Sequence, residues 1–261
     1  MVMPVEWELL RSGPEDAEHG VLMLPGGASP ARSYDDVMAQ PILGGVRLVA
    51  ATLPGHVGTP PPEDFSIESC ARAAAVLAAD NHCDVVVGYS MGATVAVEVA
   101  ASGLFPGPVV LLGVSLSPRD EPAFFRAVVR LGAVLGGLPS AALMRAAAMA
   151  VRGARVPEER RARMRADLRR NDPRVLRQAL RAYLDYLGRY GSPAERLCGA
   201  GVPVWVVHAE KGDGGLTDEE RRTLEVCPHT SVVTVPGTSF FLPDEEPQRV
   251  AGIIAEAVGM A

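Results

Sequence analysis

The clearest chemical signal in the sequence is a serine held between two glycines, in the order Gly88-Tyr89-Ser90-Met91-Gly92. Apolar residues typical of a strand precede this turn and small residues typical of a helix follow it. In that context a G-x-S-x-G motif indicates a nucleophilic serine rather than an ordinary glycine-bounded turn. We expect Ser90 to adopt a strained backbone conformation, with its hydroxyl above the carboxyl edge of a sheet. The Met91 N–H, at the positive end of the helix, would stabilise an oxyanion.

At these residues the chain resembles the α/β-hydrolase superfamily, and the resemblance extends over nearly the whole sequence. A loop after an early apolar run reads Leu-Pro-Gly-Gly at residues 24–27, where the family usually has His-Gly-x, so a proline replaces the usual histidine. The resemblance implies that the Gly27 N–H is the second oxyanion donor and that Gly26 and Tyr89 contact the substrate. Residues 53–58, Leu-Pro-Gly-His-Val-Gly, match the family's loop after the next strand.

The same resemblance places the acid of a catalytic triad just after the apolar run Val204–His208. Asp213 is the best candidate there, and Glu210 is the second. Asp213 lies one residue later than the commonest family spacing, and a turn residue among glycines is the alternative interpretation.

The histidine of a Ser-Asp-His triad is missing from its expected place. The family segment resembles P-G-x-x-H-F-L-P, whereas residues 236–243 read Pro-Gly-Thr-Ser-Phe-Phe-Leu-Pro, so Phe240 occupies the histidine position. A phenyl ring has no lone pair and no exchangeable proton, so it cannot act as a base toward Ser90. Loss of the base from a comparable triad costs on the order of 10⁶ in turnover, while residual catalysis of about 10³–10⁴ survives.

Another histidine would have to lie at the active edge of the sheet, where the carboxyl ends of parallel strands meet. His19, His82 and His229 precede expected strands and therefore belong to the opposite edge. His56 and His208 lie on the correct side. Both match family residues, and the one that His208 matches is normally structural. By the same resemblance we place His208 in the substrate pocket, with a catalytic role as the alternative.

Three explanations of the missing base remain open. The chain is a hydrolase with a single natural or engineered substitution, acting on an ester or thioester of a small or medium apolar acyl group. Alternatively, it is a lyase, cyclase or isomerase that reuses the same pocket, or a catalytically silent ligand-binding protein. The intact serine turn, glycine loop and acid favour the first.

Short apolar runs alternate with helix-like segments along most of the chain, which predicts an α/β fold with a three-layer, mostly parallel sheet. Six runs read as buried strands and one, Glu6–Arg11, as a leading antiparallel strand; the six are Val21–Leu24, Arg47–Thr52, Val85–Val87, Val109–Val114, Val204–His208 and Ser231–Val235. Residues 117–200 show helical segments and no convincing strand. We therefore predict a hydrolase core at 1–116 and 201–261 with a helical cap at 117–200.

The predicted cap and the predicted core also differ in charge. The chain has a formal net charge of −6, yet residues 119–196 contain 17 arginines against eight aspartates and glutamates. An anionic or carrier-tethered small-molecule substrate is one interpretation of the basic cap. A solvated helix face that complements an acidic core is the other, and we favour it. Nucleic acid is not expected as a partner, because the whole chain is acidic and lacks a recognition motif.

Composition narrows the class of protein to which the chain can belong. Hydrophobic residues make up 48% of the 261 residues, which permits a large core and excludes global disorder. The sequence shows no dinucleotide fingerprint, phosphate loop or metal-ligand cluster, so no cofactor and no metal are expected. Acidic residues near the start are unlike a signal peptide, so none is expected. The sequence has no apolar run long enough to cross a bilayer, so no membrane span is expected. Four scattered cysteines suggest a reduced, cytoplasmic protein. The oligomeric state is left open.

Overall fold

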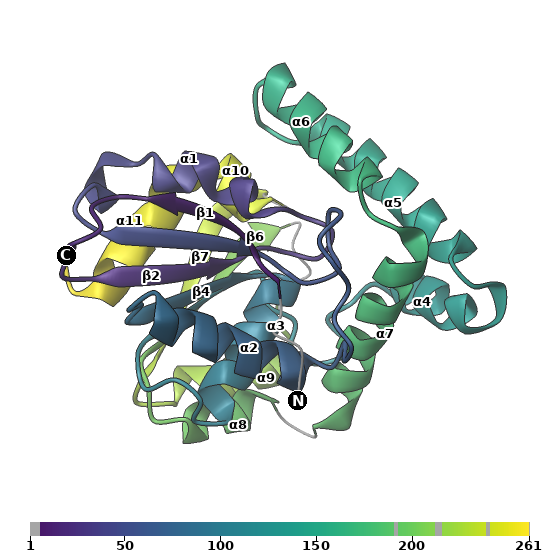
Figure 1. Ribbon diagram of the computed structural model, residues 1–261. Coiled ribbons are helices and arrows are strands. Elements are labelled where there is room, and N and C mark those ends of the chain that lie inside the picture. Colours follow the sequence, from purple (N-terminus) through teal and green to yellow (C-terminus); the bar gives the residue numbers. More distant parts are fainter. Residues whose placement is uncertain (1–5, 191–192, 212–215, 239–240, 261) are drawn as a thin grey trace.

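A seven-stranded sheet organises the computed structural model of the chain, which describes residues 6–190, 193–211, 216–238 and 241–260. The strands are β1 (Glu8–Ser12), β2 (Gly20–Leu24), β3 (Arg47–Thr52), β4 (Val85–Tyr89), β5 (Val109–Leu112), β6 (Val204–Lys211) and β7 (Thr230–Thr238). Their spatial order is β1-β3-β2-β4-β5-β6-β7 (Figure 1). Strand β1 runs antiparallel to β3, and the other neighbouring pairs are parallel. The predicted fold class is confirmed.

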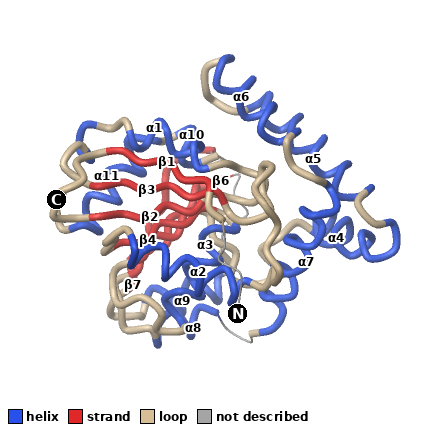
Figure 2. Tube along the Cα trace, in the orientation of Figure 1, coloured by secondary structure: helices blue, strands red, loops and turns tan. Residues whose placement is uncertain are grey.

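Helices cover both faces of this sheet (Figure 2). They are α1 (Asp35–Met38), α2 (Ile67–Asp80), α3 (Met91–Ala101), α4 (Ala123–Leu135), α5 (Leu138–Ala150), α6 (Glu158–Arg169), α7 (Pro173–Arg189), α8 (Pro193–Gly199), α9 (Asp218–Glu225), α10 (Leu242–Glu245) and α11 (Pro247–Val258). Short 3₁₀ turns lie at η1 (Ala31–Tyr34), η2 (Pro41–Leu43) and η3 (Val151–Gly153).

Strand β2 shows why the apolar runs lack a polar alternation. Side chains of a strand point alternately to opposite faces, and here both faces are buried. Leu22 packs into the cluster that contains residues of α2 and α3, whereas Val21 and Met23 pack into the cluster that contains residues of α11. Every residue of β2 is buried, so this strand is part of the centre of the fold.

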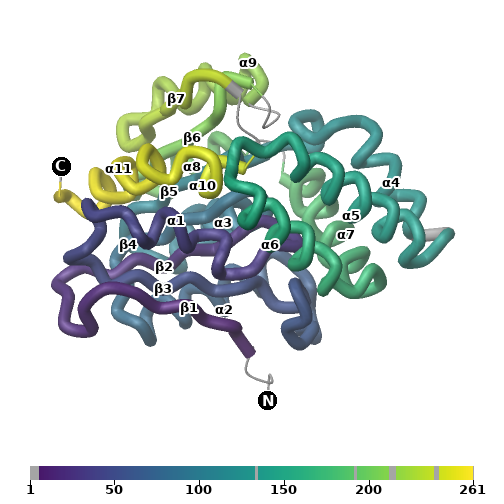
Figure 3. Tube along the Cα trace, turned by 90° about the horizontal axis from the view of Figure 1, so that it is seen from above, coloured from purple at the N-terminus to yellow at the C-terminus, as the bar shows by residue number. Residues whose placement is uncertain are grey.

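Between β5 and β6 the described chain forms helices and no strand. We call α4–α7 the inserted helices; they lie together at one end of the sheet (Figure 3). Asp172 caps the start of α7: its carboxylate accepts a hydrogen bond of 2.7 Å from the Arg174 N–H, and Pro173 occupies the first turn. Its apolar residues at helical spacing, including Leu176, Leu180 and Leu187, are buried.

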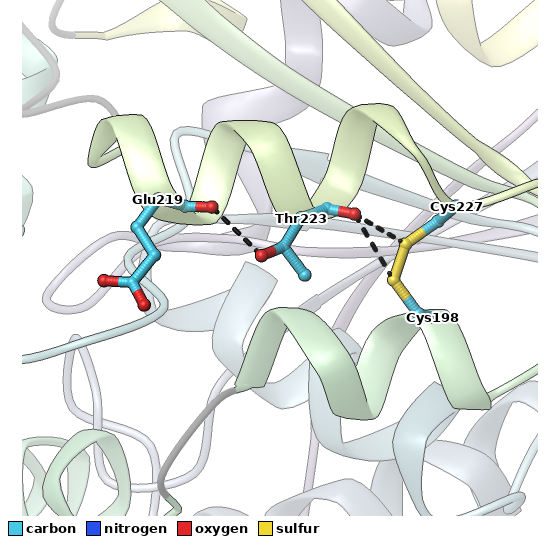
Figure 4. The surroundings of a disulfide bond; sticks show 4 residues. All are labelled: Cys198, Glu219, Thr223 and Cys227. Atoms are coloured by element: carbon cyan, nitrogen blue, oxygen red, sulfur yellow. Dashed lines mark hydrogen bonds between the residues drawn. A yellow bond between two sulfur atoms is a disulfide. The ribbon is translucent and has the colours of Figure 1, made fainter.

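Two cysteines are joined, contrary to the expectation of reduced thiols. Cys198 of α8 and Cys227, which follows α9, form a disulfide with Cα atoms 5.4 Å apart (Figure 4). Both sulfur atoms lie near the carbonyl oxygen of Thr223. The two cysteines are 29 residues apart with no CxxC spacing, so the sequence pattern alone did not indicate this pairing. Cys70 and Cys83 are free.

In the described ranges, no helix is both long and apolar enough to cross a membrane. The same residues contain no group of three or more histidines, cysteines, aspartates or glutamates that could hold a metal ion.

Candidate active site

Ser90 lies where β4 turns into α3, and its backbone is strained as the motif predicts. Its φ of 51° and ψ of −116° lie outside the regions that a serine ordinarily adopts. The Ser90 N–H donates a 2.9 Å hydrogen bond to the Leu112 carbonyl of the neighbouring strand β5. The Ser90 carbonyl accepts from the Thr94 N–H at 3.1 Å, which starts the helix. A tertiary hydrogen bond to β5 on one side of the residue and the first hydrogen bond of α3 on the other therefore maintain the strained turn.

Two glycines allow this turn to approach its neighbours closely. A β-carbon at Gly88 would lie 2.3 Å from the Gly92 carbonyl oxygen, so strand and helix nearly touch. A β-carbon at Gly92 would lie 2.2 Å from the Leu24 carbonyl oxygen at the end of β2. Any larger residue at either position would force the backbone apart.

The loop after β2 lies directly beside Ser90. A β-carbon at Gly26 would be 3.4 Å from the Ser90 β-carbon, and one at Gly27 would be 3.2 Å from the Met91 methyl group. The structure therefore brings Gly26, Gly27, Ser90 and Met91 together, with Tyr89 at 3.1 Å from the same Gly26 position.

The next residue in this loop, Ala28, is held at both of its peptide groups. Its N–H donates to Nδ1 of His56 at 3.0 Å, and its carbonyl accepts from Nδ2 of Asn171 at 3.1 Å. Burial lowers the pKa of His56 to about 4, so the imidazole is neutral at pH 7 with Nδ1 free of a proton to accept this bond. The His56 ring is thus engaged with the backbone of the glycine loop.

Sequence reasoning did not find Asn171. Its side chain is buried in the turn between α6 and α7, and its Oδ1 also accepts from the Val57 N–H at 2.9 Å. An asparagine just before Asp172 and Pro173 reads as a helix-start residue. No local pattern connects it to loops more than 100 residues earlier in the chain.

A cavity of about 450 Å³ opens beside Ser90 beneath the inserted helices. Its walls are largely apolar, and the side chains that form them include Phe124, Phe125, Leu143, Met144, Met164, Leu168, Leu176, Leu180 and Phe241. Gly26, Gly27, Tyr89, Ser90 and Met91 line the same cavity. Its size is typical of small-molecule sites.

Three carboxylates line this cavity, and two of them have arginine partners. Asp167 pairs with Arg32, and Asp244 pairs with Arg160 at 2.8 Å. Burial raises the pKa of Asp244 to about 6, although the Arg160 guanidinium acts in the opposite direction.

The third carboxylate, Glu121, has no arginine partner within the described chain. Its Oε1 accepts from Ser115 Oγ at 2.8 Å and from the Tyr183 hydroxyl at 2.5 Å. No hydrogen bond from the described residues reaches its Oε2. Burial, together with the Glu121 charge, raises the pKa of Tyr183 well above its usual value, so the phenol stays neutral and donates to Glu121.

The other predicted site residues belong to β6 or to the segments that follow β6 and β7. Asp213 and Phe240 are outside the described residues. Glu210 is exposed at the end of β6, and its Oε2 accepts a 3.0 Å hydrogen bond from the Gly237 N–H. His208 is buried within β6, opposite Thr234, and does not belong to the described lining of the cavity. The five histidines all fall in the described ranges, and none of them lines this cavity.

The sequence model of the Alpha/beta hydrolase family matches residues 21–253, so the chain belongs to this family. No curated protein matches the sequence. Among solved structures, a thermophilic esterase from Thermogutta terrifontis, with malate bound, has a TM-score of 0.77 at 17% identity, over 97% of this chain and 92% of that chain.

Two further solved structures are similar in fold. A variant of AqdC, in complex with the Pseudomonas quinolone signal whose ring it cleaves, has a TM-score of 0.76 at 21% identity, over 100% of this chain and 98% of that chain. A mutant of the N-acyl homoserine lactonase AidH, complexed with N-hexanoyl homoserine, has a TM-score of 0.73 at 17% identity, over 97% and 95% of the two chains. The family match indicates a hydrolase-type enzyme, and these solved structures share its fold.

Proposed function

We propose that this chain acts on an ester or thioester of a small or medium apolar acyl group. The observation that carries the proposal is the strained Ser90 at the start of α3, beside the Gly26–Gly27 loop and open to an apolar cavity of about 450 Å³. An esterase and a lactonase among the similar folds support the same reaction class.

In this proposal Ser90 is the nucleophile that attacks the acyl carbonyl. The backbone N–H groups of Gly27 and Met91 stabilise the negative charge that develops on the carbonyl oxygen. Asp213 is the acid of the triad, and Glu210 is the second choice. Phe240 stands where the family has its base, so the triad is incomplete and hydrolysis by the chain as it exists is slow. The reaction needs no cofactor and no metal.

The test is to restore the base. We expect Phe240→His to raise the hydrolysis of p-nitrophenyl esters from acetate to decanoate by about 10²–10⁴-fold, the usual contribution of a positioned general base. Adding Ser90→Ala to Phe240→His should abolish the gain. Absence of any gain across the ester panel would count decisively against the proposal.

A second function, non-hydrolytic proton transfer, is favoured by one specific observation. None of the histidines lines the cavity, whereas the Glu121 carboxylate does, with an oxygen that no described residue engages. A carboxylate that lines the same cavity as oxyanion donors can remove a proton from the carbon next to a carbonyl, while the donors stabilise the enolate. That step belongs to a lyase, cyclase or isomerase.

Methyl ketones of four to ten carbons separate the two functions, because they enolise but cannot be hydrolysed. Under the second function, the chain accelerates exchange of their α-protons for deuterium in D₂O. Glu121→Gln should then lower the rate by about 10²-fold or more, and Ser90→Ala should leave it largely intact. If no exchange occurs, and esters bind but are recovered unchanged even from the Phe240→His chain, the chain is a ligand-binding protein and both enzymatic proposals are wrong.

A further inference from the structure

Three strained residues occupy the loops that follow three adjacent strands. Ala28 after β2, Val57 after β3 and Ser90 after β4 have left-handed φ angles of 63°, 50° and 51°. Such angles are unusual for residues other than glycine, and most of all for a β-branched valine. Conformations of this kind persist only where the surroundings hold them in place.

One side chain of the inserted helices holds two of these three residues. Asn171 donates from Nδ2 to the Ala28 carbonyl at 3.1 Å and accepts at Oδ1 from the Val57 N–H at 2.9 Å. The same Nδ2 lies 3.2 Å from the carbonyl oxygens of Asp167 and Leu168 in α6. Asn171 therefore connects α6, the loop after β2 and the loop after β3 through one buried amide.

The glycine loop is held from its other side by the loop after β3. His56 accepts from the Ala28 N–H at 3.0 Å, so both peptide groups that flank the Ala28 α-carbon are engaged. With these two bonds in place, the backbone that carries Gly27 has little freedom to rotate. Loss of the Asn171 contact would leave the carbonyl side of Ala28 free to move.

We propose that Asn171 is a positioning residue that couples the seating of the inserted helices to the geometry of the oxyanion donor at Gly27. The proposal rests on the proposed function, in which the Gly27 N–H stabilises the oxyanion. The helices that form the walls of the cavity then also fix the position of the Gly27 N–H, which lies on the loop that lines the same cavity. Loss of the Asn171 contact releases Ala28 and weakens transition-state stabilisation, while the residues that form the cavity wall are all still present.

Asn171→Asp is the most selective test. The aspartate has nearly the same shape and still accepts from Val57, but it has no N–H to donate to the Ala28 carbonyl. We expect kcat toward the p-nitrophenyl esters to fall by about 10- to 100-fold, with KM within about twofold, because an oxyanion donor acts in the transition state. Backbone amides of residues 24–31 should exchange hydrogen for deuterium faster.

Two further variants keep this test decisive. Asn171→Ser is uncharged and smaller, and it serves where the buried aspartate prevents folding. Gln178→Ala, at an exposed position of α7, is the matched control and should leave kcat and exchange unchanged. A lowered melting temperature with kcat and the exchange of residues 24–31 at their reference values would overturn the proposal, since it would show a purely structural role.

The kinetic measurements are made in the Phe240→His chain, where hydrolysis is expected to be measurable, and the exchange measurements in the unmodified chain. If Phe240→His hydrolyses no ester, the proposed function fails, and the exchange data still decide whether Asn171 holds the loop. If the ester is hydrolysed and neither Asn171 variant changes kcat or exchange, only the coupling is wrong.

Discussion

Under the proposed function, the geometry of attack by Ser90 and the chemistry of proton transfer come from different parts of the chain. The φ of 51°, the glycine contacts and the adjacent Gly26–Gly27 loop all belong to residues that the structure describes. In the proposed function the base would belong to the segment that contains Phe240, and no histidine is among the described residues that line the cavity. Oxyanion stabilisation and general-base catalysis are separate contributions to rate. A site with only the first should therefore respond strongly when the second is added.

His56 makes the stability of the folded chain depend on pH. Its pKa is about 4 in the folded chain against an ordinary value near 6.5, because the ring is buried. Between these two values the unfolded chain binds more protons than the folded one, so the stabilising contribution is present above pH 6.5 and is lost as the pH falls to 4. The shift corresponds to about 3 kcal/mol. Protonation of Nδ1 also removes the acceptor of the Ala28 N–H.

His56→Asn tests this assignment, since the asparagine Oδ1 can take the place of Nδ1 as acceptor and does not titrate. We expect the free energy of unfolding, measured by urea at pH 7, 5.5 and 4.5, to fall less steeply with acid in His56→Asn than in the parent chain. His82→Asn is the control, at an exposed histidine whose φ of 49° an asparagine tolerates well. Equal pH slopes for the parent and His56→Asn would contradict the assignment.

At the scale of elements, the sequence was sufficient to predict the sheet. Apolar runs predicted each strand to within a few residues, and Glu6–Arg11 corresponds to the antiparallel strand Glu8–Ser12. Strand β7 is longer than expected, at Thr230–Thr238, since Pro236 and Gly237 are typical of a turn and mark the end of the apolar signal. Local composition determines these elements because parallel strands buried on both faces need continuous apolar residues.

The contacts that hold the site together were not predictable in the same way. Asn171 and Ala28 are 143 residues apart, and the sequence gives no reason to pair them. The motif indicated Ser90 because strand, turn and helix are adjacent in the chain. The loops that support it are brought together only by the tertiary fold, so their hydrogen bonds have no local signature.

Across the whole molecule, ion pairs attach the basic insertion between β5 and β6 (residues 117–200, which include α8 as well as the inserted helices) to the acidic core. Arg160 binds Asp244 at 2.8 Å, and it also lies 3.5 Å from both Asp35 and Asp36. Arg196 binds Glu98 at 2.9 Å. Charge complementarity between insertion and core therefore accounts for part of the arginine excess without a charged partner. An anionic or carrier-tethered substrate stays a proposal that these pairs do not require.

The disulfide is the other whole-molecule constraint, because it closes a loop that contains β6 and α9. In the chain-entropy description, a loop of 29 residues stabilises the folded state by about 3–4 kcal/mol. Cys198→Ser should therefore lower the melting temperature by about 10 °C, and a reductant should do the same to the parent chain but not to the variant. Cys70→Ser, which removes a free thiol, is the matched control. Thiol titration of the denatured parent should find two thiols before reduction and four after it. Four thiols before reduction would show that the bond does not form, and the melting temperature would then be insensitive to reductant.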